Sequence, residues 1–165
     1  MPSSISSAKA YRIASANSEL IETICLTDRG PDNDLSQAEM VAGRIVDFMG
    51  RAEETLELAL YDIRLPDPVG KVVAEAFRDA AARGVKTRLA YNDVPENPDD
   101  GHFLPALHPP PETNPGILSA LPIEARAISG IPDLMHHKYI VADGKSVWTG
   151  SANWSVYSWT RQENV

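Results

Sequence analysis

The residues best suited to chemistry lie in a short C-terminal stretch between His136 and Asn153. His136 and Lys138 stand two residues apart in a run typical of an extended strand, so their side chains are expected on one face. His137 then points to the other face, and Asp143, an odd number of residues from both, also faces away. A glycine after Asp143 favours a hairpin turn that returns Asn153 to the side of His136. The stretch therefore predicts one pocket holding an imidazole, an ammonium and a carboxamide.

Such a pocket suits a phosphodiester. Lys138 and Asn153 can donate hydrogen bonds to non-bridging oxygens, and Ser151 can donate a further one, which stabilises charge in the transition state. His136, deprotonated near neutral pH, can attack phosphorus and form a covalent phosphoenzyme. A metal pair of His136 and His137 is disfavoured because adjacent strand residues diverge, and His137 is expected to be a packed or hydrogen-bonded core histidine. No carboxylate cluster accompanies the stretch, so neither a metal nor a cofactor is expected.

The same stretch matches a known spacing. Its pattern, His-x-Lys-x4-Asp-x6-Gly-Ser-x-Asn from His136 to Asn153, resembles the HKD motif of the phospholipase D superfamily at all six fixed positions. Chance would produce it in roughly one sequence in 10⁵ or fewer. A strand over 56–63, a helix over 69–83 and a strand ending in Tyr91-Asn92-Asp93 are also similar to the family. The resemblance covers about residues 20–165, although only the motif is specific.

The resemblance implies a role for each matched residue. His136 would be the nucleophile that forms a phosphohistidine, while Lys138 and Asn153 would bind phosphate. The motif aspartate, Asp143, would be structural and stay out of phosphate contact. A glutamate beyond the motif commonly orients the histidine, and Glu163 is the candidate here. For most members of the family no metal is implied.

One feature departs from the family pattern. Family active sites pair two motifs, so that one histidine attacks and the other protonates the leaving alkoxide. This sequence has a single His-x-Lys, and His102 and His108 lack a lysine at the matching place. The expected partner is a second HKD motif, either in a missing C-terminal half or from a homodimer. The first is favoured because the pattern stops after Val165, where the family begins another strand.

Alternating strands and helices are expected to position the motif. Ser36 and Glu39 form a capping box that opens a helix over 36–52, and a second helix covers 69–83. The predicted strands cover 21–26, 56–63, 85–91, 123–128, 138–141 and 146–149. The strand–helix–strand unit around the second helix favours a parallel strand pair. We therefore expect an α/β fold with a mixed central β-sheet flanked by helices on both faces.

The predicted domain organisation has three parts. Residues 1–18 are expected to be a flexible N-terminal segment, and 19–165 a phospholipase D-like domain that is incomplete at its C-terminus. A loop over 92–116 contains seven of the 13 prolines and interrupts the domain. Single Cys25 excludes an intrachain disulfide, and its favoured interpretation is one buried small apolar residue. Neither a signal peptide nor a transmembrane segment is visible, which favours a cytoplasmic location.

Composition bears on the substrate. A formal net charge of -8 argues against a protein that coats nucleic acid, because such binding needs many Lys and Arg. The first choice of substrate is therefore a phospholipid head group. A homodimeric endonuclease of the same superfamily and a catalytically incomplete interaction domain are the alternatives. Aromatic residues near the motif's end are expected to be core rather than a rim that touches lipid; they are Trp148, Trp154, Tyr157 and Trp159.

Overall fold

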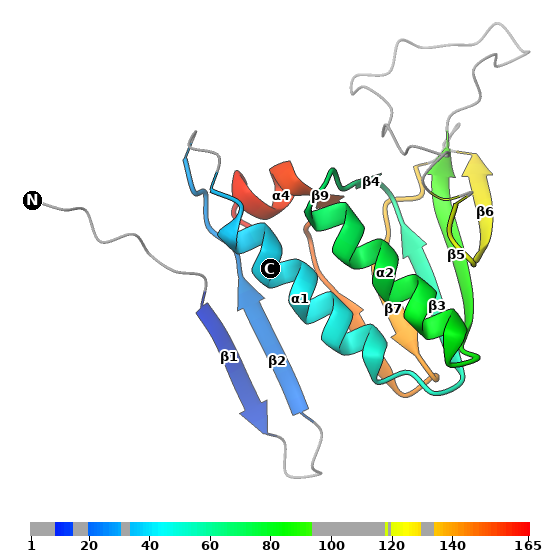
Figure 1. The fold of residues 1–165 in the computed structure, drawn as a ribbon. Helices are drawn as coiled ribbons and strands as arrows, with labels where there is room; N and C mark the ends of the chain where they lie inside the picture. Colours follow the sequence, from blue (N-terminus) through cyan, green and yellow to red (C-terminus); the bar gives the residue numbers. More distant parts are fainter. Residues whose placement is uncertain (1–8, 15–19, 31–33, 94–117, 119, 130–133) are drawn as a thin grey trace, which may run out of the picture.

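The computed structural model describes residues 9–14, 20–30, 34–93, 118, 120–129 and 134–165 (Figure 1). Its elements are, in chain order, β1 (Lys9–Ala14), β2 (Leu20–Cys25), α1 (Ser36–Gly50), β3 (Thr55–Leu60), β4 (Ile63–Arg64), α2 (Val69–Ala82), β5 (Lys86–Asp93), β6 (Glu124–Ser129), β7 (Lys138–Ala142), β8 (Ser146–Thr149), β9 (Trp154–Ser155) and α4 (Val156–Thr160). The predicted Pro-rich loop, from residue 94 onward, lies outside the described residues. So do His102 and His108.

The main sheet has five strands in the order β6-β5-β3-β7-β8. β3 and β5 are parallel, as are β5 and β6, whereas β7 pairs antiparallel with both β3 and β8. α1 and α2 lie side by side across one face of this sheet (Figure 1). These features confirm the predicted α/β fold with a mixed sheet and flanking helices. Among the described residues both long helices cover the same face.

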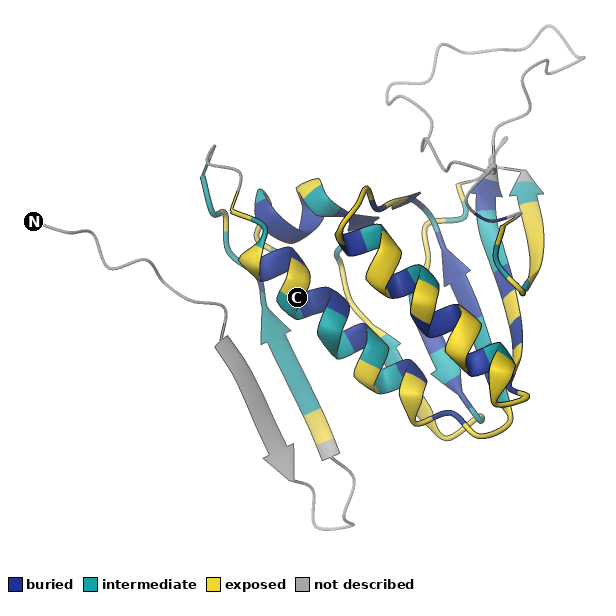
Figure 2. Cartoon of the chain, in the orientation of Figure 1, coloured by how far each residue is buried: buried dark blue, intermediate teal, exposed yellow. Residues whose placement is uncertain are grey.

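The core forms between that face and the two helices. Leu56, Leu58 and Leu60 alternate along β3 and are at most 4% exposed, and Leu58 pairs with the fully buried Ile140 of β7. Each helix has a buried side and an exposed side (Figure 2), and the buried side is mainly apolar. The buried side of α1 keeps the predicted helical spacing through Ala38, Val41, Ala42, Ile45 and Met49. Burying each large aliphatic side chain stabilises the fold by about 1.5–3 kcal/mol.

Two local predictions are wrong. Ser36 does not cap α1, because it is the first helical residue and Leu35 stands at the N-cap position. The amide N–H of Ser36 instead donates to the carboxylate of Asp34, two residues earlier, at 2.9 Å. The strand predicted over 56–63 is not continuous. β3 ends at Leu60, where it pairs with β7, and the chain then changes partner, so that Ile63 in β4 pairs with Trp154 in β9. Tyr61 and Asp62 therefore lie between β3 and β4, and we call this position the strand break.

A two-stranded ribbon stands apart from the main sheet. β1 pairs antiparallel with β2, and β1 lies inside the segment 1–18 that the sequence predicts as flexible. Beyond β2, Leu26 makes an isolated antiparallel bridge with Asn164, near the end of the chain. None of the helices in the described ranges is long and apolar enough to cross a bilayer.

Two helical glycines give a matched test of packing. In α2 a Cβ on Gly70 would collide with the carbonyl oxygen of Leu65, whereas in α1 a Cβ on Gly43 would meet nothing within 4 Å. We expect Gly70→Ala to destabilise the protein by about 1–3 kcal/mol through overpacking. Gly43→Ala should stabilise it by about 0.5–1 kcal/mol, because alanine loses less backbone entropy in a helix. Urea unfolding followed by circular dichroism measures both, and equal effects of the same sign would contradict this packing.

Candidate active site

The candidate site lies where β3 ends and β7 begins. Leu60 pairs with Lys138, and the next amide, that of Tyr61, donates to the carbonyl of His137 at 2.8 Å. This ladder brings the break after β3 against the residues just before β7. His136 lies there with its side chain exposed, while Lys138 is only 8% exposed. The site therefore combines an accessible imidazole with a largely buried ammonium.

The Tyr61 ring contacts both motif side chains. Its centroid is 4.6 Å from that of the His136 ring, in an edge-to-face arrangement with an interplanar angle of 66°. The Nζ of Lys138 lies 5.0 Å from the same centroid, within the range of a cation–π interaction. One aromatic ring thus holds the imidazole and the ammonium on the same side of the strand break.

Two further contacts define the Lys138 ammonium. Its Nζ donates to the backbone oxygen of His136 at 2.9 Å, so the lysine folds back along its own strand. Burial lowers the pKa of Lys138, and the negative charge of Asp62 opposes that change. Asp62 is only 2% exposed and forms an ion pair with Arg64. A terminal guanidinium nitrogen of Arg64 donates to the carboxylate at 2.7 Å, and the Nε of Arg64 donates to its other oxygen at 2.9 Å. Asp62 thus brings a compensating charge to the buried lysine.

His136 is electrostatically suited to be uncharged. Desolvation lowers its pKa most, and the positive charges of Lys138 and His137 lower it further. Since the ordinary value is already near 6.5, the neutral imidazole is the dominant form at neutral pH. A neutral ring has a free nitrogen lone pair, which both a nucleophile and a general base require.

Asn153 approaches from the other side of the strand break. The amide of Trp154 donates to the carbonyl of Asp62 at 3.1 Å, and Ile63 pairs with Trp154 in the short parallel ladder. This ladder places Asn153 beside Asp62, just as the β3–β7 ladder places Lys138 beside Leu60. The Oδ1 of Asn153 is buried and has no hydrogen-bond partner in the described part of the protein. A buried acceptor without a partner costs about 1–3 kcal/mol, and such costs concentrate at functional positions.

Asp143 lies at the opposite end of β7 from Lys138. Its carboxylate accepts three backbone amides, those of Glu53 at 2.9 Å, Glu54 at 2.8 Å and Thr55 at 2.8 Å. Its own backbone has a φ of 54°, next to Gly144 with 63°, which forms the tight turn into β8. Asp143 therefore ties the β7–β8 hairpin to the start of β3. It lies in the turn beyond Ala142, so its orientation follows from these hydrogen bonds and not from strand alternation.

The remaining candidates lie toward the end of the chain. The hydroxyl of Ser151 donates to Asn164 Oδ1 at 2.8 Å and accepts the amide N–H of Val165 at 3.1 Å, so these two residues occupy it. Glu163 is exposed in the segment after α4, and no hydrogen bond joins it to His136. The structure thus brings His136, Lys138 and Asn153 toward one strand break, whereas Ser151 is bonded to Asn164 and Val165 and Glu163 is exposed.

His137 and Tyr157 lie at the surface, whereas Trp154 and Trp159 lie in the core. His137 is exposed, with its ring 5.8 Å from that of Tyr139, so the prediction of a packed core histidine is wrong. Trp154 and Trp159 are 3% and 1% exposed and pack edge to face, which confirms the core interpretation for these two. Tyr157, by contrast, is exposed.

Sequence reasoning missed Tyr61 and Asp62. The sequence prediction placed both residues inside one apolar strand. They are, however, two consecutive polar residues directly after Leu60, where β3 ends. Polar residues at the C-terminal end of a strand in an α/β sheet are a usable signal, because ligands bind at such ends. Among the residues that the structure describes, no group of three His, Cys, Asp or Glu side chains is arranged to hold a metal ion.

Comparison with known proteins identifies the family of the chain. The family described as "Cardiolipin synthase, PLD-like domain" matches residues 45–165, a range that contains the main sheet and the whole motif. The chain belongs to this family, and so to the phospholipase D superfamily.

One solved structure shows the same fold, and a second is less similar. NucT from Helicobacter pylori is similar with a TM-score of 0.56 and 20% identity, covering 78% of this chain and 76% of that chain. Nuc from Salmonella typhimurium, a phospholipase D family member, is similar with a TM-score of 0.49 and 20% identity, covering 74% and 70%. No curated protein matches the chain.

The clamp made by Asp143 predicts a pH-dependent contribution to stability. Its hydrogen bonds to Thr55, Glu53 and Glu54 lower the pKa of Asp143, so its stabilisation is complete above the unfolded pKa of about 3.9. That stabilisation is lost as the pH falls through the lower, folded pKa. We expect Asp143→Asn to lower the urea midpoint at about pH 7 and to have a smaller effect at about pH 3. Asp47→Asn, exposed on α1, is the control, and an Asp143→Asn effect independent of pH would contradict the clamp.

Proposed function

We propose that this protein is a phosphodiesterase that works through a covalent phosphohistidine on His136. The observation that carries the proposal is the shared contact of His136 and Lys138 with the Tyr61 ring. An imidazole with a lowered pKa stands beside an ammonium that can bind a phosphate oxygen. Asn153, aligned on the opposite side of the strand break, adds a carboxamide that can donate to a second oxygen.

The proposed reaction has two steps. In the first, a ring nitrogen of His136 attacks phosphorus, a P–N bond forms, and the P–O bond to the leaving alkoxide breaks. A second imidazole donates its proton to that alkoxide. In the second step the same imidazole takes a proton from water, whose oxygen attacks phosphorus and breaks the P–N bond. Members of the superfamily pair two HKD motifs, and we propose that a second motif supplies this imidazole, in cis or from a second copy of the chain.

A phospholipid is the proposed substrate. The family match carries the description of cardiolipin synthase, and the net charge of -8 disfavours a polyanionic duplex. Leu134, two residues before His136 in the chain, is 52% exposed. An exposed apolar side chain close to the motif histidine favours a substrate with an apolar part over one with phosphates along its whole length.

A labelling experiment tests the nucleophile. Incubating the protein with a ³²P-labelled phosphodiester and trapping with acid-free denaturation should leave label on the chain, because the P–N bond survives in alkali. His136→Ala should abolish this label. The adjacent His137→Ala provides the matched control and should keep it, since His137 is exposed on the other face. Label that persists in His136→Ala would overturn the assignment of His136.

A substrate panel tests the proposed class. We expect turnover of phosphatidylglycerol vesicles to exceed that of single-stranded DNA and of a chromogenic diester by at least about tenfold in kcat/KM. Light scattering on the same samples determines whether the active species contains one chain or two. Faster cleavage of DNA would overturn the lipid assignment and leave the role of His136 intact. Absence of turnover with every diester, at every chain concentration, would instead support a non-catalytic interaction domain.

A further inference from the structure

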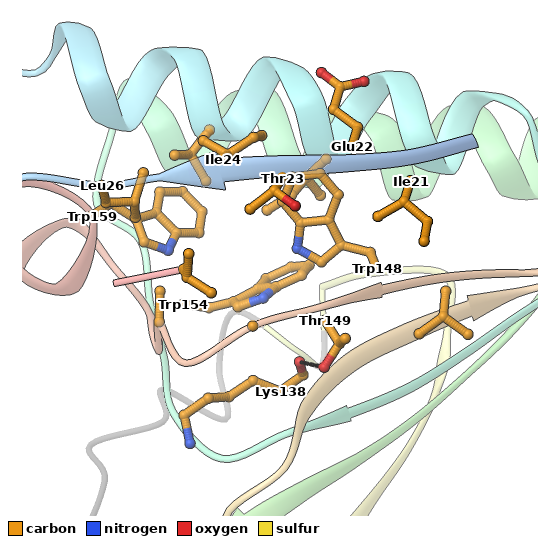
Figure 3. Close-up of a pocket in the computed structure, with 16 residues that line it drawn as sticks. Ile21, Glu22, Thr23, Ile24, Leu26, Lys138, Trp148, Thr149, Trp154 and Trp159 are labelled. Atoms are coloured by element: carbon orange, nitrogen blue, oxygen red, sulfur yellow. Dashed lines mark hydrogen bonds between the residues drawn. The ribbon is translucent and has the colours of Figure 1, made fainter. Parts of the chain in front are cut away.

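The segment that carries His136 lies outside the regular sheet. β7 begins at Lys138, so His136 and His137 precede it. Lys138 itself is held within the sheet by its pairing with Leu60. Its carbonyl also accepts the hydroxyl of Thr149 at 3.3 Å, the bond drawn as a dashed line in Figure 3. Strand pairing therefore places the lysine, whereas the histidine needs other contacts to fix its position.

Two neighbouring strands hold the main chain on either side of His136. At the end of β3, the amide of Tyr61 donates to the carbonyl of His137 at 2.8 Å. At the end of β5, the side-chain oxygen of Asn92 accepts the amide N–H of Met135 at 3.1 Å. His136 thus stands between two fixed main-chain groups, each in an adjacent residue.

The place of Asn92 follows from the lengths of the strands. The parallel ladder between β3 and β5 ends at the pair of Leu60 and Tyr91, whereas β5 continues beside β6, where Asn92 pairs with Ile128. The same register sets Asn92 beside Tyr61, the first residue of the strand break. Asn92 therefore lies at the C-terminal edge of the parallel strands, where α/β sheets bind their ligands.

The side chain of Asn92 is committed to this one contact. It is 0% exposed, and its Nδ2 has no hydrogen-bond partner among the residues that the structure describes. Of its two polar atoms only the oxygen can accept an N–H, so the contact with Met135 sets the orientation of the amide. A buried donor without a partner is unfavourable, and a leucine of similar size would avoid it. The acceptor for Met135 is what asparagine provides here and leucine would not.

A third contact on this segment comes from Lys138, whose Nζ donates to the carbonyl of His136 at 2.9 Å. A phosphate oxygen that binds the ammonium competes for this bond, so the contact weakens when substrate is bound. The bonds made by Asn92 and by the amide of Tyr61 do not involve the ammonium. They remain to hold the histidine at the moment when its position matters.

We propose that Asn92 is a positioning residue for the nucleophile: by holding the amide of Met135, it keeps the His136 imidazole against the Tyr61 ring, in the place from which it attacks phosphorus. This inference rests on the proposed phosphodiesterase function. Asn92 acts through the main chain and does not touch the substrate. Displacing a reacting group by about 1 Å can lower a rate by about a hundredfold, so an anchor one residue away is sufficient to control the first step.

Pre-steady-state labelling of the full chain with a ³²P-labelled phosphodiester at varied concentration tests the role. Asn92→Leu removes the acceptor and should lower the maximal rate of phosphohistidine formation at least about tenfold. The half-saturating concentration should change less than about threefold, because Lys138 is placed by the pairing of β7. Asn92→Asp keeps an oxygen acceptor at the same place and should restore the maximal rate to within about threefold of the wild-type value.

Thr87→Val is the matched control. Thr87 lies on the same strand, toward its other end, is 6% exposed, and has a hydroxyl oxygen without a partner in the described ranges. The substitution also exchanges a buried polar group for an apolar one of similar size, but away from Met135. It should leave the labelling rate unchanged. Circular dichroism checks that each variant folds.

A structural measurement needs no turnover. The ring protons of His136 report its contact with Tyr61 in an NMR spectrum, because the centroid of that aromatic ring lies 4.6 Å away. Tyr61→Leu gives the reference spectrum without the ring. Asn92→Leu should move the His136 resonances toward this reference and speed hydrogen exchange at the amide of Met135. Asn92→Asp and Thr87→Val should do neither.

Four results would overturn the proposal. They are an unchanged rate and an unchanged His136 spectrum in Asn92→Leu, equal losses in Asn92→Leu and Asn92→Asp, an equal loss in Thr87→Val, and a raised half-saturating concentration with an unchanged maximal rate. The last would assign Asn92 to substrate binding. A wild-type chain that takes up no label, although Asn92→Leu still displaces the imidazole, would contradict the proposed function and support the placement of His136 by Asn92.

Discussion

The antiparallel pairing of β3 with β7 organises the whole molecule. Its inner side chains, such as Leu58 opposite Ile140, form the centre of the core. Its two ends have different tasks. At one end Asp143 ties the hairpin turn to the amides that precede β3, and at the other end the ladder delivers Lys138 to the ring of Tyr61. A shift of this register by one residue would reverse the faces of the strand and separate the ammonium from the ring.

A second, much shorter ladder completes the site, and it explains why β3 stops where it does. Pairing with β7 ends at Leu60, and pairing with β9 begins at Ile63. Between these two pairings the main chain of Tyr61 and Asp62 is held by His137 on one side and Trp154 on the other. A buried carboxylate and an aromatic ring are thereby fixed between two strands from distant parts of the sequence.

Local patterns in the sequence predicted most of the elements, because helix faces such as that of Val41 and Ile45 depend only on spacing. The motif also placed His136 and Lys138 together. The break at Tyr61 escaped prediction because it depends on pairing with β9, much later in the chain. The contact of Ser151 with Asn164 is equally non-local. In contrast, the hydrogen bond from Ser36 to Asp34 and strand β1, where Tyr11 and Ile13 alternate with polar or small residues, had local signals that were overlooked.

The resting position of Lys138 has a consequence for ligand release. Its ammonium already donates to the carbonyl of His136 and lies against the Tyr61 ring. An anion that binds the ammonium must replace at least part of these contacts. The net binding free energy is therefore the difference between the new interactions and the contacts that are lost. A small anion without further contacts gains little from that exchange. The site is thereby biased toward ligands whose remaining atoms contribute their own binding energy, and against retention of free phosphate.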